Sequence, residues 1–350
     1  MLNDREGFTM TLTQRKMKIL AAIVNSYIET CEPVGSKLIA ANMGVSSATV
    51  RNEMAELSEM GYLDQPHTSA GRVPSERGYR FYLDHLMEPY DLSFAERQVL
   101  DSALHAHSID TDRLFQNIAN AIARVTHLSV AATTPSGIMA TVRAVQFVQT
   151  SRRTAMIVLM ASTGTIKTKV FHCDFDLTPD ILRIFFRVFN EKLARKRVIE
   201  ITPAFVQNFG ASLGEMIFLM ATALAALEEV AADTLQSEVC IDGQMNLLFC
   251  PEYKDGSLLP IMEYLDRPQE FAQLIRGRRE KTQTLCGSEI GRRELISSGL
   301  AISKYYVGKE EAGAIGILGP MRMNYGKCEA VLSYITESLG EVLTRLMEEE

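Results

Sequence analysis

The chain has 350 residues, of which 47% are hydrophobic and 23% charged, and its formal net charge at pH 7 is −7. This length and apolar content predict two or three domains with substantial cores. The longest apolar run, residues 216–227, is too short for the roughly 20 residues that cross a bilayer. The amino-terminal sequence lacks the pattern of a secretory leader. We therefore expect a cytoplasmic protein with no membrane association.

Cysteine and histidine spacing gives no sign of a metal or redox centre. The six cysteines are scattered without a C-x-x-C pair, which is typical of free buried thiols in a reducing compartment. His105 and His107 are two residues apart in a predicted helix and cannot share a face, so we expect no metal site. The sequence also lacks G-x-S-x-G, H-E-x-x-H and P-loop motifs, so we expect neither an enzyme nor a cofactor.

Three helices are predicted near the amino terminus. Apolar residues recur at helical spacing between Thr13 and Thr30, with Thr13 as the N-cap. Ser36 can cap a short helix over residues 37–42, and Gly44 supplies the backbone freedom for a tight turn into a third helix. Such a short connection indicates a helix-turn-helix.

The third helix has the chemistry of a DNA-recognition helix. Val50, Met54 and Leu57 form one inward stripe. The opposite face and the amino end present unpaired N–H groups, small hydroxyls, an arginine suited to guanine and an asparagine suited to adenine. The acidic second half predicts an end-on approach to the major groove. The candidate DNA-binding residues of this helix are Ser46, Ser47, Thr49, Arg51 and Asn52.

A two-stranded wing is predicted after Gly61. Residues 62–66 read as a strand and residues 68–71 as a turn leading into a second strand. We expect the wing tip to contact phosphate or a minor groove. Its candidate residues are His67, Thr68, Ser69 and Arg72.

The charge of this region is modest for a DNA-binding protein. From Thr13 to Tyr82 there are eight basic and seven acidic residues. Few phosphates can be neutralised by so small an excess of positive charge. We therefore expect weak non-specific binding and a strong dependence on two such domains binding together.

The segment GVSSATVRNEMAELSEMGYLDQPHTSAGRVP closely resembles the HrcA-type heat-inducible transcription repressors of bacteria. The resemblance extends to residues 243–253, GQMNLLFCPEY, and to residues 313–325, which are similar to that family's GxxGxxGPxRMxY segment. One departure is Ser58, where the family usually has glutamate. Because Ser58 follows the half of the helix expected to face the groove, we expect little effect of this departure on recognition.

Beyond Pro89 the pattern predicts an α+β domain interrupted by an insertion. A capping box at Ser93 and Glu96 marks the start of a helical segment. Three antiparallel strands are expected between residues 142 and 171. More helices follow them, and strand-like sequence returns from residue 282. The resemblance implies a GAF-like domain with an inserted, mainly helical dimerisation domain. The expected units are a winged helix-turn-helix over 1–90, the GAF-like domain over 91–176 and 276–350, and the insertion over 177–275.

The resemblance implies a repressor that binds double-stranded DNA as a homodimer at an inverted repeat called CIRCE, upstream of chaperone genes. It also implies a GroEL-type chaperonin as partner and release of the operator on heat shock. Two alternatives remain open. A GAF-like pocket would suit a metabolite-sensing regulator, and a helix-turn-helix can serve as a protein-docking scaffold without DNA.

Overall fold

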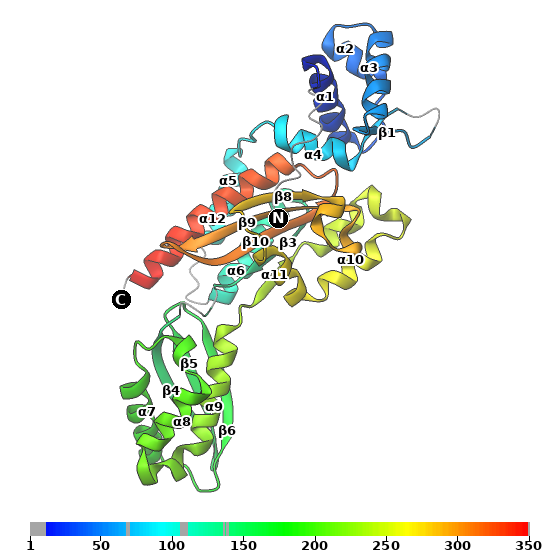
Figure 1. Ribbon diagram of the computed structural model, residues 1–350. Coiled ribbons are helices and arrows are strands. Elements are labelled where there is room, and N and C mark those ends of the chain that lie inside the picture. The colour runs from blue at the N-terminus through cyan, green and yellow to red at the C-terminus, as the bar shows by residue number, and fades with distance from the viewer. Residues whose placement is uncertain (1–11, 68–70, 106–110, 136, 138–139, 349–350) are drawn as a thin grey trace, which may run out of the picture.

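A computed structural model describes residues 12–67, 71–105, 111–135, 137 and 140–348. Figure 1 shows three bodies in an elongated arrangement: a small helical unit at one end, a central sheet covered by helices, and a second sheet with helices at the other end. Within the described part of the chain, no helix is long and apolar enough to cross a membrane.

The first body is a winged helix. Its elements are α1 (Gln14–Thr30), α2 (Ser36–Met43), α3 (Ser47–Glu59), β1 (Leu63–Asp64), β2 (Val73–Pro74) and α4 (Glu76–His85). Thr13 caps α1 as predicted, and Val50, Met54 and Leu57 of α3 are buried against the other helices. The second helix differs slightly from the expectation, since Ser36 is its first residue and Gly35 its N-cap.

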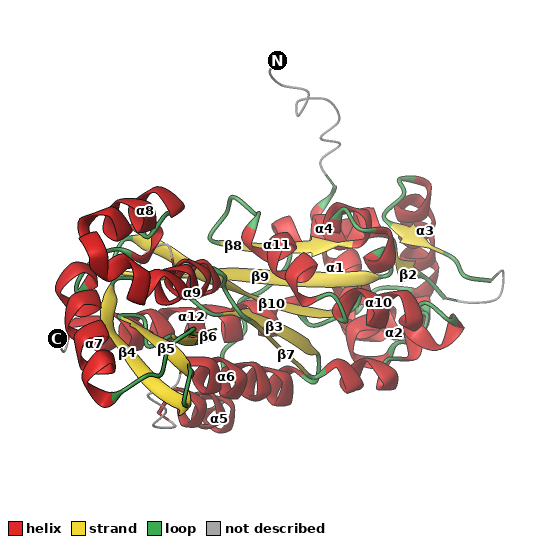
Figure 2. Ribbon diagram, turned by 90° about the horizontal axis from the view of Figure 1, so that it is seen from below, coloured by secondary structure: helices red, strands yellow, loops and turns green. Residues whose placement is uncertain are grey.

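The central body is built on one antiparallel sheet with the strand order β7-β3-β10-β9-β8. Helices α5, α6 and α12 cover one face, whereas α10 and α11 cover the other (Figure 2). The elements are α5 (Phe94–His105), α6 (Thr111–Thr126), β3 (Ser129–Thr133), β7 (Val239–Asp242), α10 (Leu258–Leu265), α11 (Pro268–Arg276), β8 (Thr282–Cys286), β9 (Ser298–Val307), β10 (Glu310–Pro320) and α12 (Tyr325–Glu348).

Glycines in β10 allow close packing on both faces of this sheet. A Cβ atom at Gly316 would lie 2.8 Å from a methyl carbon of Ile275 in α11, and one at Gly319 would lie 2.6 Å from Leu128. Both distances are shorter than van der Waals contact. The regularly spaced glycines of residues 313–319 therefore serve strand packing.

The third body is inserted between the neighbouring strands β3 and β7. It contains the antiparallel sheet β4-β5-β6 with α7, α8 and α9 packed on one face. The neck is closed by paired hydrogen bonds, from Thr134 N to Glu238 O (2.9 Å) and from Glu238 N to Thr134 Oγ1 (2.8 Å). The elements are β4 (Val142–Ser151), β5 (Thr154–Ala161), β6 (Ile166–His172), α7 (Pro179–Leu193), α8 (Pro203–Ser212) and α9 (Ile217–Leu235).

The inserted unit differs in extent from the sequence expectation. The three strands predicted between residues 142 and 171 are present and antiparallel, but they form their own sheet and share a core with α7, α8 and α9. A boundary at residue 176 would separate this sheet from the helices that cover it. The expected boundary at 275 is also displaced, since β7, α10 and α11 pack with the central sheet. The insertion therefore consists of the three-stranded sheet and the helices that pack on it.

A glycine in α4 provides a test of the winged-helix packing. A Cβ atom at Gly78 would lie 2.1 Å from the carbonyl oxygen of Tyr62, a backbone atom that cannot move aside alone. We expect Gly78→Ala to lower the free energy of unfolding by about 1 to 3 kcal/mol, as overpacking does. Thermal unfolding followed by circular dichroism measures the change.

Gly35→Ser is the matched control, because nothing lies within 4 Å of a Cβ atom at Gly35 and serine is favoured at an N-cap. If Gly78→Ala and Gly35→Ser unfold at the same temperature, the contact between α4 and Tyr62 is looser than described.

Candidate nucleic-acid interface

The amino end of α3 is an exposed, capped helix terminus. Ser46 is the N-cap, and its hydroxyl oxygen accepts a hydrogen bond from Thr49 N at 3.1 Å. The hydroxyls of Ser46 and Thr49 also lie 2.8 Å apart. The other amide groups of the first turn retain the partial positive charge of a helix start. This end of α3 therefore offers donors suited to a phosphate.

Ser47 joins the two helices of the motif. Its hydroxyl lies 3.1 Å from that of Ser36, the first residue of α2. The amino ends of α2 and α3 are thereby held together, and Lys37 is exposed beside them. The sequence interpretation assigned Ser36 only a capping role and did not single out Lys37. A lysine one residue after the start of the preceding helix was the available signal.

Arg51 and Asn52 lie on the exposed side of α3. Among the described residues, no hydrogen bond or ion pair involves either side chain. Ala48, one turn before Asn52, is also exposed and short, so it allows a surface to approach the helix closely. The guanidinium and amide groups are therefore available to base edges.

The acidic second half of α3 is partly neutralised by α1. Lys16 Nζ lies 2.9 Å from Glu53 Oε2 and 2.7 Å from Glu56 Oε2, while Arg15 lies 3.8 Å from Glu53. Hydrogen bonds to Glu56 and Glu53 raise the pKa of Lys16. Only the third carboxylate of this half, Glu59, remains exposed without a described ion pair. Repulsion between α3 and a DNA backbone is therefore weaker than the sequence alone implies.

The wing is only partly described. His67 is exposed beyond β1, whereas Thr68 and Ser69 lie outside the described residues. Arg72 corrects the expectation of a tip position, because it lies at the base of the wing, where its backbone pairs with Val34. Its Nε donates to Ser58 Oγ at 2.9 Å. The residue that departs from the family pattern thus supports the wing base.

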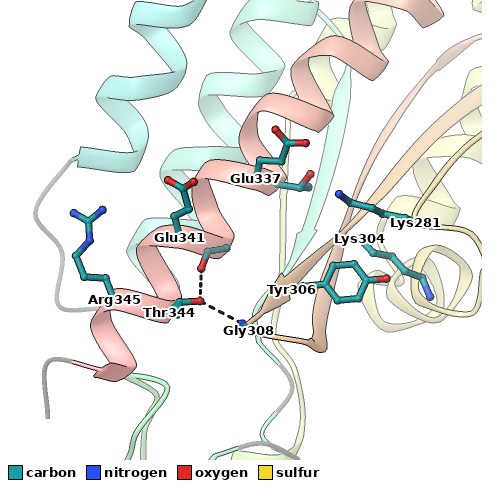
Figure 3. Close-up of a pocket in the computed structure, with 10 residues that line it drawn as sticks. Lys281, Lys304, Tyr306, Gly308, Glu337, Glu341, Thr344 and Arg345 are labelled. Atoms are coloured by element: carbon teal, nitrogen blue, oxygen red, sulfur yellow. Dashed lines mark hydrogen bonds between the residues drawn. The ribbon is translucent and has the colours of Figure 1, made fainter.

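A cavity of about 500 Å³ lies between α12 and the edge of the central sheet (Figure 3). Glu337, Glu341 and Arg345 of α12 line it together with Lys281, which precedes β8. Lys304, which is buried, already pairs with Glu311 at 2.7 Å. This mixed and partly neutralised lining does not favour a purely anionic metabolite.

Comparison with known proteins covers both parts of the chain. Residues 11–83 match the family model described as a winged helix-turn-helix transcription repressor, HrcA DNA-binding, and residues 112–328 match the HrcA protein C terminal domain. A heat-inducible transcription repressor HrcA from Acetivibrio thermocellus is 33% identical over 344 residues, covering 97% of this chain and 98% of the relative. The protein of the same name from Pelotomaculum thermopropionicum is 31% identical, covering 97% and 99%.

One solved structure shares the overall fold. It is the crystal structure of a hypothetical protein, with a TM-score of 0.69 and 24% identity, covering 96% of this chain and 99% of that chain. The family matches span both the winged helix that contains α3 and most of the interrupted α+β body. The chain therefore belongs to the HrcA family of heat-inducible transcription repressors and carries that family's winged-helix DNA-binding domain.

Proposed function

We propose that the protein represses transcription by occupying an inverted-repeat operator as a homodimer. The observation that carries the proposal is the exposed amino end of α3, with Arg51 and Asn52 beside it and the central body at the opposite end of the winged helix (Figure 1). A two-fold dimer presents two such ends to the two halves of a palindrome. Blocking a promoter in this way requires no catalytic step and no cofactor.

The finer assignments rest on the family. The curated relatives are named heat-inducible, which supports a role in the heat-shock response. We propose the CIRCE operator upstream of chaperone genes as the DNA target, a GroEL-type chaperonin as the partner that maintains the active repressor, and the cytoplasm as the location. The test is affinity for a CIRCE duplex and a scrambled duplex at fixed salt, measured along a temperature ramp with and without chaperonin.

The inserted unit supplies a surface suited to a second copy. On the face of the β4-β5-β6 sheet away from the helices, cross-strand pairing places Val148, Met156 and Val170 in one row and Ala144, Met160 and Ile166 in another. Val148, Ile166 and Val170 are 44%, 56% and 59% exposed. An exposed apolar face of this kind is typical of obligate dimers. Two-fold pairing there supports simultaneous binding of both operator halves.

Base recognition by α3 gives a prediction for binding. Arg51→Ala or Asn52→Ala should cost about 1 to 3 kcal/mol of binding free energy at the operator and relax the base preference at one position. Arg72→Ala should weaken binding to all duplexes alike, through loss of the wing base. Fluorescence anisotropy with operators mutated one base pair at a time distinguishes the two behaviours.

Arg124→Ala is the control for charge removal, because Arg124 is exposed on α6 in the central body. If Arg51→Ala and Asn52→Ala both bind the operator with the same affinity as Arg124→Ala, α3 is not the recognition helix.

The proposed dimer surface gives a prediction for the oligomeric state. Val158 lies at the centre of the apolar face, opposite Gln146 on β4 and Thr168 on β6. Val158→Lys places a charge there and should convert the dimer into a monomer in sedimentation experiments. Gln207→Lys, at an exposed position of α8, adds the same charge elsewhere and should leave the dimer intact.

A competing surface surrounds Phe218, which is 83% exposed at the start of α9. Dissociation by Phe218→Lys, together with an intact Val158→Lys dimer, would place the interface there instead of on the sheet.

A further inference from the structure

The carboxyl end of α1 docks on the central body through a nearly buried ion pair. Arg322 lies between β10 and α12, and Glu252 lies in the short helical turn Pro251–Asp255. The two side chains form an ion pair and are only 19% and 18% exposed. Both residues come from the central body, yet both reach the winged helix.

Each partner of the ion pair contacts α1 directly. Arg322 Nη1 donates to the carbonyl oxygen of Ile28 at 2.9 Å. Cys31, the left-handed C-cap of α1, donates its thiol proton to Glu252 Oε1 at 3.3 Å. Carbonyl groups in the last turn of a helix lack intrahelical partners and carry the negative end of the helix dipole. The guanidinium therefore binds α1 at the position where a cation is most favourable.

A second attachment holds the other side of the winged helix. Glu76 of α4 accepts a hydrogen bond from Ser288 N at 2.9 Å. Arg80 of the same helix donates to Thr284 O at 2.9 Å and pairs with Glu289 at 3.1 Å. Tethers at α1 and α4 restrict rotation of the winged helix about either one. The direction of α3 relative to the central body is thereby set.

We propose that Arg322 and Glu252 are positioning residues that set the spacing of the two recognition helices in the dimer. The inference rests on the proposed binding of an inverted repeat. One half-site requires only α3 and the wing, whereas both half-sites require two winged helices at a defined separation. The gain from the second half-site depends on an effective concentration that falls when the connection is loose or misdirected. Breaking the ion pair should therefore reduce the gain in affinity that the second half-site provides.

The test compares one half-site with the full inverted repeat. Arg322→Ala should lower full-site affinity by about tenfold or more and change half-site affinity by no more than about twofold, because only tethered binding is lost. Inserting base pairs between the half-sites should strongly lower the operator affinity of the native protein and lower that of Arg322→Ala much less. Arg322→Lys retains the charge but has one donor group in place of the guanidinium fork. Its full-site affinity should therefore lie between that of the native protein and that of Arg322→Ala.

Glu252→Gln provides an independent variant that preserves shape, and it carries the test if Arg322→Ala fails to fold. Arg267→Ala is the matched control, since Arg267 pairs with Glu270 on the surface of the central body and should bind both duplexes as the native protein does. Equal losses at half-site and full site, an unchanged full-site affinity or an increased one would each overturn the proposal. Failure of the native protein to prefer the inverted repeat over a scrambled duplex would instead refute the proposed function.

Discussion

The antiparallel pairing of β9 with β10 is the constraint on which the remaining structure depends. This ladder joins residues 298–307 to residues 310–320, and β10 is buried on both faces. One face receives α11 and the other contacts α12. Arg322 follows β10 by two residues, and β8, which contacts α4, pairs with β9. The position of the winged helix is therefore fixed by the same sheet that forms the central core.

The candidate DNA-binding surface is built from short polar side chains. The hydroxyls of Ser36 and Ser47 bond to each other and hold the starts of α2 and α3 together, while those of Ser46 and Thr49 bond to each other at the start of α3. Such short side chains lose little rotamer entropy when they are ordered. Arg51 and Asn52, the side chains proposed to read bases, are exposed. The low net charge is consistent with the proposed homodimer, in which two linked sites contribute more binding free energy than phosphate neutralisation does.

Local patterns predicted the winged helix well because its signals lie within a few residues of one another: the cap at Thr13, the turn at Gly44 and the buried stripe of α3. The sequence did not reveal β3 and β7, whose pairing joins residues about a hundred positions apart. The base position of Arg72 depends on pairing with Val34, another contact without a local signal. The extent of the insertion was misjudged because three strands predict a sheet without indicating which core that sheet covers.

The neck between Thr134 and Glu238 has a consequence for how this architecture arose. Since the strands that enter and leave the inserted unit are adjacent and hydrogen-bonded, the chain departs from the sheet and returns to it at nearly one point. Evolution can enlarge, shorten or exchange everything beyond that point without altering the register of the central strands. The inserted unit, with the dimer surface proposed for it, can therefore diverge independently of the winged helix among descendants of one ancestral scaffold.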